Sequence, residues 1–444
     1  MKLFNELKLK FEHTDWSKNP EFGLIDTILE KYPQLILILK DDILKGGKES
    51  NMGRGDTPTV EQIVRAAIYK EMKSLDYREL EYAQSDSRIC ANFIKLDMRK
   101  PYSFQMFQSY ISKITVENLH KLLVEINKIA ITEGFEDMSR IGSDATVVES
   151  NIHYPTNNAL LWDCIKESHR QLKELKEEIQ DLDYIDYMKG AKLTYFKINN
   201  TKSGDKRVDL FKKQLQTFTK TINNVSNAIK KKSGSLRGVM LQKKLEEFRN
   251  TLDRVYMMVY TKEIQGDTVP DQEKIYSIFE QHTDIIVKGS REVQFGHKIN
   301  IATGKSNLIL DCCILQGNPS DKDLYQPTIE RVISNYNIVP RDVATDGGYA
   351  TKANMEYAKQ KGIVNIVFNK IVGSMKNIVS SLSMEKRLKK WRSSLESTIS
   401  NLKRGFNISR CNWKGWEHFQ AKVLWSVLGY NFRVLTALTL AKIG

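Results

Sequence analysis

The chain has 444 residues, of which 41% are hydrophobic, and it carries a formal net charge of +14 at pH 7. This length is too great for one simple core, and the hydrophobic content excludes wholesale disorder. The strong positive charge predicts a polyanionic partner, and nucleic acid is the expected one.

The cysteine content and the hydropathy of the chain indicate the cellular compartment in which we expect the protein. The five cysteines are odd in number and include no C-x-x-C pair, which argues against a disulfide framework and a zinc knuckle. No stretch approaches the roughly 18 consecutive apolar residues that a membrane span requires. We therefore expect a protein of the reducing cytoplasm without a membrane partner.

The amino-terminal part, residues 1–135, is predicted to be a helical domain. Thr57-Pro58 supplies an N-cap and a proline at the first helical position, and the apolar residues that follow recur at helical spacing. A second helix can begin at Tyr77, and a further helical region covers about 103–131. Two short helices joined by a turn suit a DNA-binding helix-turn-helix, and they suit a plain helical bundle equally well.

The pattern changes at residues 140–150, where β-branched and apolar residues surround Asp144. This arrangement predicts a strand that carries an inward carboxylate. From about 158 to 264 the pattern is helical again, with apolar residues at alternating steps of three and four. Such seams predict three antiparallel helices that pack as an inserted bundle, with a basic turn at 230–235.

Strand patterns return after the helical segment. We expect strands over 284–288, 292–302 and 308–315, then a helix over 322–335 and a buried strand that ends at Asp346. Two glycines follow Asp346 directly, and glycine allows a tight turn or the close approach of another group. An Asp before two glycines is by itself more often plain turn chemistry, so the partners of Asp346 decide its role.

The order of these elements, with one more strand over 362–368, defines the expected fold class. It resembles an RNase H-like α/β core, in which a mixed sheet is flanked by helices, with an N-terminal helical domain and a large inserted helical bundle. The expected catalytic domain comprises residues 136–157 and 265–444, and the insertion comprises residues 158–264.

A third acidic residue lies on a helix that is predicted to end at Gly405. Arg392, Glu396 and Lys403 share one face of this helix, so one carboxylate lies between two cations. In isolation this spacing is typical of an ordinary ion pair on a solvated face. Glu385 also lies in a basic helical segment and is the alternative third acid.

Two Asp residues on strands and one Glu on a following helix are the ligands that two Mg²⁺ ions need. Mg²⁺ prefers hard oxygen ligands, and two such ions can activate an attacking oxygen while stabilising a leaving one. No catalytic His or Cys is required for phosphoryl transfer of this kind. The combination therefore predicts a metal-dependent site at Asp144, Asp346 and Glu396.

From about residue 141 to its end, the chain resembles the DDE transposases of bacterial insertion sequences, in an ISNCY-like or related group. The resemblance rests on three motifs, which are Gly142-Ser143-Asp144-Ala145-Thr146, Ala344-Thr345-Asp346-Gly347-Gly348-Tyr349, and Arg392-Ser393-Ser394-Leu395-Glu396 with Lys403. Many relatives carry a Tyr three positions before the Arg of the third motif, where this chain has Lys389.

The resemblance implies a transposase that uses two Mg²⁺ ions, with Mn²⁺ as a substitute, to cut element ends and join them to target DNA. It implies double-stranded DNA as partner, a homodimer or higher assembly, and a nucleoid-associated place in the bacterial cytoplasm. Expected DNA contacts are Arg392, Lys403, His297 and Lys298, although the sequence alone also suits a half-buried His297. The alternatives are an RNase H-like nuclease or resolvase without strand transfer, and a non-catalytic, domesticated DNA-binding protein.

Overall fold

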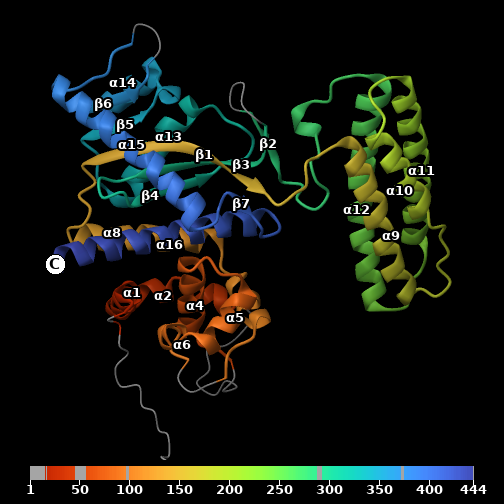
Figure 1. Cartoon of the computed structure of the whole chain (residues 1–444), viewed down its shortest axis with the longest axis horizontal. Helices are drawn as coiled ribbons and strands as arrows, with labels where there is room; N and C mark the ends of the chain where they lie inside the picture. The colour runs from red at the N-terminus through yellow and green to blue at the C-terminus, as the bar shows by residue number, and fades with distance from the viewer. Residues whose placement is uncertain are drawn as a thin grey trace, which may run out of the picture. The chain divides into compact units, whose positions relative to one another are not determined.

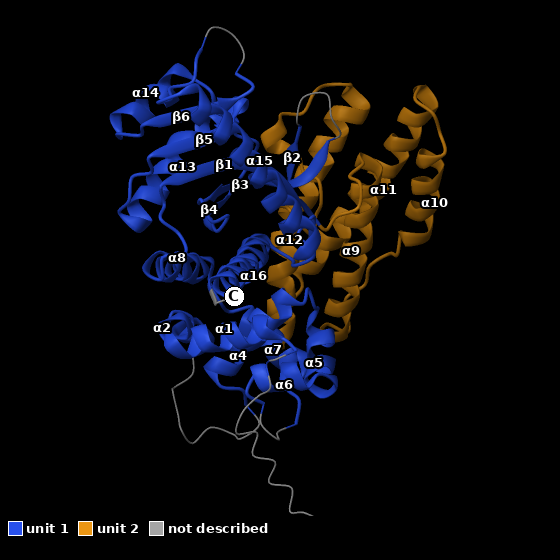
Figure 2. Cartoon of the chain, turned by 60° about the vertical axis from the view of Figure 1, so that its left-hand side comes forward, with its two compact units in different colours: residues 1–150, 284–444 blue, residues 151–283 orange. Residues whose placement is uncertain are grey.

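The computed structural model of the chain describes residues 16, 18–45, 57–96, 100–287, 293–371 and 375–443 (Figure 1). It forms two compact units, which Figure 2 colours separately: unit 1 comprises residues 1–150 and 284–444, and unit 2 comprises residues 151–283. The helices of the amino-terminal part share one hydrophobic core with strands of the sheet. The structure therefore groups that part with the predicted catalytic domain.

Eight helices precede the sheet in the described residues. Thr59 caps the fourth of them and forms a capping box with Gln62, so this helix begins at Val60, two residues later than Thr57-Pro58 predicted. The expected helical region 103–131 is divided, because Thr115 caps a new helix. The helices are α1 (Pro20–Lys31), α2 (Gln34–Leu37), α3 (Lys40–Ile43), α4 (Val60–Met72), α5 (Tyr77–Asp86), α6 (Arg88–Phe93), α7 (Phe104–Ile111) and α8 (Val116–Thr132).

The sheet of unit 1 is mixed. β1 pairs with β3 in antiparallel fashion and with β5 in parallel fashion, β4 and β2 pair with β3, and β6 pairs parallel to β5. The order β4-β3-β1-β5-β6, antiparallel and then parallel, is the RNase H-like arrangement that the sequence predicted. The strands are β1 (Arg140–Ser150), β2 (Asp284–Ile286), β3 (Gln294–Thr303), β4 (Ile309–Ile314), β5 (Asp342–Asp346), β6 (Asn365–Asn369) and β7 (Arg410–Cys411). Residues 288–292, at the ends of two predicted strands, lie outside the described residues.

Helices cover both faces of the sheet. Side chains alternate between the two faces of a strand, and β5 shows this directly. Val343 packs in the cluster of α13 (Asp321–Tyr336) and α14 (Lys352–Gln360), whereas Ala344 packs against Leu388 of α15 (Leu382–Gly405). The long helix α15 crosses the strands on its face of the sheet, as Figure 1 shows.

The last helix, α16 (Trp416–Ile443), joins the sheet to the amino-terminal helices. The amide of Asn431 donates to Ile309 O at 2.8 Å and accepts from Ile309 N at 2.9 Å, so it satisfies the backbone of β4. Residues Trp416–Lys442 are long and apolar enough to cross a membrane by length and composition, which the search for uninterrupted apolar runs missed. Because 67% of the apolar window is buried within the protein, it occupies the place of a core helix.

Unit 2 is a helical bundle. The sequence predicted three long helices, and the structure has four in this region. The shorter one buries only Ala191, Thr194 and Ile198, so it has no run of large buried apolar residues to mark it. The buried seam Phe211, Phe218 and Val225 lies in its core as predicted. The elements are α9 (Asn157–Glu178), α10 (Met188–Asn199), α11 (Asp205–Lys230), α12 (Leu236–Tyr260), η1 (Thr261–Gln265) and η2 (Asp271–Glu273).

Candidate active site

Two neighbouring strands place Asp144 and Asp346 at the same level of the sheet. β1 and β5 run parallel, and their last paired residues are Ser143 and Thr345. Asp144 and Asp346 come next on each strand, and parallel strands keep such positions side by side. The pairing of strands that are separated by unit 2 in the sequence thus brings the first two predicted acids together.

Helix α15 adds the third acid and a cation to this place. Arg392 donates from Nη2 to Asp144 Oδ2 at 2.8 Å and from Nη1 to Glu396 Oε1 at 2.8 Å, and Nη2 lies 3.8 Å from Asp346 Oδ1. The Arg392 side chain is 6% exposed, whereas the carboxylates of Asp144, Asp346 and Glu396 are 19%, 43% and 66% exposed. One buried guanidinium therefore bridges three carboxylates that solvent can reach.

Small residues on β1 and β5 allow α15 to pack close to the sheet. Gly142 and Ala344 each precede an acid by two positions, so they face the helix as the acids do. A Cβ at Gly142 would lie 2.4 Å from Cδ1 of Leu395 and 3.2 Å from the ring of Trp391. The first motif therefore needs glycine for packing beneath the helix that carries Arg392 and Glu396.

A second glycine fixes the turn after Asp346. A Cβ at Gly347 would lie 2.6 Å from the carbonyl oxygen of Lys370 and 2.7 Å from that of Asn369, and neither backbone atom can move aside cheaply. We expect Gly347→Ala to lower the free energy of unfolding by about 1–3 kcal/mol through overpacking and to displace Asp346. Chemical denaturation and a DNA cleavage assay measure both effects.

The matched control is Gly348→Ala. Its Cβ would meet only the Asp321 side chain, with Oδ2 at 3.0 Å, and that side chain can give way. Equal losses of stability in the two variants would contradict the role assigned to Gly347.

A buried hydrogen-bond network joins side chains that lie near the two Asp residues in the chain. Tyr349 Oη donates to Asn300 Oδ1 at 2.6 Å, and Ser143 Oγ donates to the same oxygen at 3.2 Å. Burial, and then the charges of Asp321 and Asp144, raise the pKa of Tyr349 well above its ordinary value. The sequence did not identify Asn300, because its partners lie 157 and 49 residues away.

The two candidates for the third acid lie in different surroundings. Glu385, in the first turn of α15, pairs with Lys389 at 2.7 Å and accepts a hydrogen bond from Asn377 at 2.8 Å. It lies about 16 Å along the helix axis from Glu396, at about 1.5 Å per residue. Lys403 lies in the last turn of α15, two turns beyond Glu396.

His297 and Lys298 lie in the interior and not on a DNA-facing surface. The His297 side chain has no exposed surface, lies 3.0 Å from Asp284 through Nδ1, and packs against the rings of Trp416 and Phe419. Lys298 is 5% exposed and donates from Nζ to Pro319 O at 2.7 Å. The prediction that these two residues contact DNA is corrected, because both side chains are enclosed by the fold.

The carboxylates have the donor chemistry that Mg²⁺ requires, since all are hard oxygen ligands. Among the described residues, however, no three His, Cys, Asp or Glu side chains already stand close enough to hold one ion. Arg392 accounts for this difference, because it bridges Asp144 and Glu396. The side chains therefore offer the oxygen donors that suit a divalent ion, and in this structure the guanidinium engages them.

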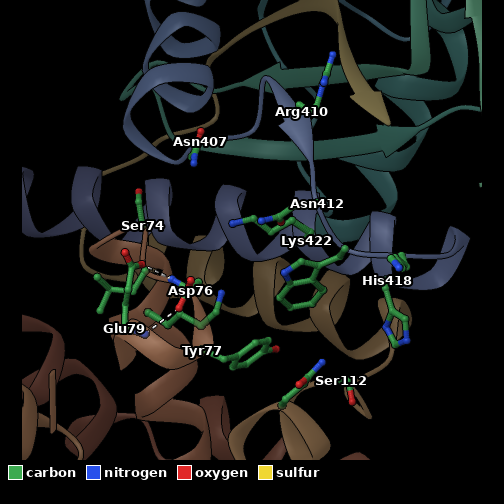
Figure 3. Close-up of a pocket in the computed structure, with 15 residues that line it drawn as sticks. Ser74, Asp76, Tyr77, Glu79, Ser112, Asn407, Arg410, Asn412, His418 and Lys422 are labelled. Atoms are coloured by element: carbon green, nitrogen blue, oxygen red, sulfur yellow. Dashed lines mark hydrogen bonds between the residues drawn. The ribbon is translucent and has the colours of Figure 1, made fainter. Parts of the chain in front are cut away.

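A separate pocket of about 820 Å³ lies elsewhere in unit 1 (Figure 3). It contains none of the three acids, and its walls come from α4, α5, α7, α16 and the segment before α16. At its edge, the buried carboxylate of Glu71 accepts from Lys70 at 2.8 Å and from Lys422 at 2.5 Å. These ion pairs connect α4 to α16, so we assign the cluster a structural role.

The strand order, with one acid within β1 and another at the end of β5, defines the class: an RNase H-like domain with an acidic site beneath a helix. Residues 281–432 match the family described as the transposase DDE domain, and this range includes Asp346 and Glu396. Residues 281–432 therefore form a transposase DDE domain, and this match supports the resemblance to DDE transposases and a transposase function in general. The match does not extend to an ISNCY-like group.

A second match carries less weight. Residues 142–252 match the xRRM domain family, yet the structure of that range is β1 followed by the helices of unit 2. No curated protein and no solved structure shows a significant match to the chain.

Proposed function

We propose that this transposase uses divalent metal ions to hydrolyse a phosphodiester at each element end, and that the freed 3′-hydroxyl then attacks target DNA. The observation that carries the proposal is the convergence of Asp144, Asp346 and Glu396 on the guanidinium of Arg392. Three carboxylates from two strands and one helix meet there, at the surface of an RNase H-like sheet. Such a cluster suits the positioning and charge neutralisation that phosphoryl transfer needs.

The three carboxylates would hold two Mg²⁺ ions, or Mn²⁺ in their place, which supply activation of the attacking oxygen and stabilisation of the leaving oxygen. Side chains of the protein would bind the phosphates of the DNA. Arg392 can exchange its carboxylate partners for a phosphate, which a guanidinium binds through two parallel hydrogen bonds. Lys403, two turns further along α15, adds a point charge for the same strand.

The structure supports Glu396 over Glu385 as the third acid. Arg392 pairs with both Glu396 and Asp144, whereas Glu385 pairs with Lys389 and Asn377 near the other end of α15. Glu396 is also 66% exposed, so a substrate can reach it.

The proposal includes the partners and the place of action. Double-stranded DNA, as element ends and as target, is the substrate, and two ends must be held together, which requires a homodimer or a higher assembly. The helices of residues 1–135 would read the ends. The protein would act in the bacterial cytoplasm, in association with the nucleoid.

A strand-transfer assay with pre-cleaved ends tests the proposal. We expect joined products in the presence of Mg²⁺ and none in EDTA, because the 3′-hydroxyl is supplied and only the second step remains. Cleavage of intact ends without any joining would favour the nuclease or resolvase alternative. Binding with neither reaction would favour a domesticated DNA-binding protein.

A further inference from the structure

The charges of unit 2 are unevenly distributed along its sequence. Residues 151–209 carry ten acidic and ten basic side chains, and residues 246–283 carry eight acidic and four basic ones. Between them, residues 210–245 contain nine Lys or Arg and no Asp or Glu. The basic segment covers most of α11, the turn after it and the first part of α12.

The exposed face of α11 is a continuous stripe of cations and amides. Positions 211, 215, 218, 222 and 225 are buried in the bundle, so the opposite side of the helix faces solvent. The exposed residues recur at steps of three and four, which places them in one line along the helix. We call this line the basic stripe, and its members are Lys213, Gln216, Lys220, Asn223, Asn227 and Lys230.

The lysines of the basic stripe differ from the paired cations of α9. On α9, Arg170 pairs with Glu167 and Glu174, and Lys176 lies 3.6 Å from Asp183. In the part of the chain that the structure describes, Lys213, Lys220 and Lys230 form no ion pair. The three lysines of the stripe therefore keep their charge exposed to solvent, without a carboxylate of the described residues beside them.

The composition and length of the stripe fit one kind of ligand. Lys, Asn and Gln side chains bind phosphate oxygens, and such contacts carry affinity without reading sequence. From Lys213 to Lys230 the stripe extends about 26 Å along the helix. Duplex DNA carries one phosphate charge per about 1.7 Å of its axis, so a stripe of this length can meet several phosphates on one side of the duplex.

We propose that the basic stripe of α11 is a binding surface for the sugar-phosphate backbone of duplex DNA, separate from the acidic site in unit 1. The inference rests on the proposed function only for the choice of DNA as the polyanion. The contact is independent of sequence and of divalent metal, so it adds salt-sensitive affinity to whatever the rest of the chain recognises.

Binding of the full chain to a 30-base-pair duplex of arbitrary sequence, in EDTA, tests the proposal. Fluorescence anisotropy gives the affinity at several salt concentrations. For Lys213→Gln/Lys220→Gln/Lys230→Gln we expect an affinity at least about tenfold lower and a log-log salt slope shallower by about two to three. The matched control, Lys173→Gln/Lys176→Gln/Lys192→Gln, loses the same charge from exposed positions outside the stripe and should bind within about twofold of the unchanged chain.

An Arg variant and thermal melting distinguish loss of charge from loss of folding. Replacing the three stripe lysines with Arg keeps the charge and should retain binding, and thermal melting shows whether each variant folds. The proposal would be overturned if the stripe variant bound the duplex with unchanged affinity. It would also be overturned if the control lost as much affinity as the stripe variant, or if the Arg variant lost affinity. Binding to phosphatidylserine vesicles that depends on the stripe, with duplex binding unaffected, would overturn it in favour of a lipid surface. Asp346→Asn should bind the duplex as the unchanged chain does, whether or not Asp346 is a catalytic residue. The failure of one proposal can therefore be distinguished from the failure of the other.

Discussion

Asp346→Asn is expected to abolish Mg²⁺-dependent cleavage and strand transfer while leaving duplex binding intact. The substitution keeps the size of the side chain and removes the charge that would hold a divalent ion beside Asp144. Loss of several kcal/mol of charge stabilisation in the transition state corresponds to about 10³-fold or more in rate. Single-turnover cleavage of a labelled element end, with and without the substitution, measures the effect.

Asp144→Asn and Glu396→Gln should cause losses of the same order, because all three carboxylates meet the guanidinium of Arg392. The control is Glu385→Gln, which removes an equal charge from the same helix and should retain most of the activity. If Glu385→Gln abolished cleavage and Glu396→Gln did not, the third acid would be reassigned. Full activity in all four variants would refute the site.

Glu71→Gln is expected to produce the largest loss of stability. Its carboxylate is 3% exposed and is shared by the amines of Lys70 and Lys422, so removing its charge leaves two buried cations without a counter-charge. Breaking a buried ion pair by removal of one partner costs about 3–5 kcal/mol. Urea unfolding of the two proteins at pH 7 gives the difference. Glu21→Gln, which breaks the more exposed pair with Arg433, should cost less than about 1 kcal/mol.

The same carboxylate gives the stability of the protein a pH dependence. Burial by itself would raise the pKa of Glu71. The charges of Lys422 and Lys70 outweigh burial and lower this pKa from 4.5 to about 2. Since the folded pKa is below the unfolded one, the contribution of Glu71 is complete above about pH 4.5 and is lost as the pH falls towards 2. This shift corresponds to about 3 kcal/mol. The difference between the unchanged chain and Glu71→Gln should shrink over that interval, and a constant difference would contradict the assignment.

Local patterns were sufficient to predict the parts of the site that lie on regular elements. β-Branched residues around Asp144 and the glycines after Asp346 marked two strands, and the spacing of Arg392 and Glu396 placed them on one helical face. The RNase H-like strand order followed from the sequence of elements. These features depend on residues that are neighbours in the chain.

Features that depend on distant partners could not be predicted in this way. A strand pattern shows that His297 and Lys298 point to opposite faces, but it does not show that both faces are covered. Glu71 and Lys422 are 351 residues apart, so no local spacing reveals their contact. The helical pattern of residues 1–135 suggested a separate domain, and only the structure shows the core that these helices share with the sheet.

The position of Arg392 has a consequence for the protein before it meets any ion. Without a nearby cation, three carboxylates held this close would repel one another and tend to spread apart. In the absence of metal, the guanidinium supplies the positive charge that keeps these acidic side chains together. Under the proposed function, metal binding would exchange one cation for others, and Arg392 would then be available to a phosphate of the DNA.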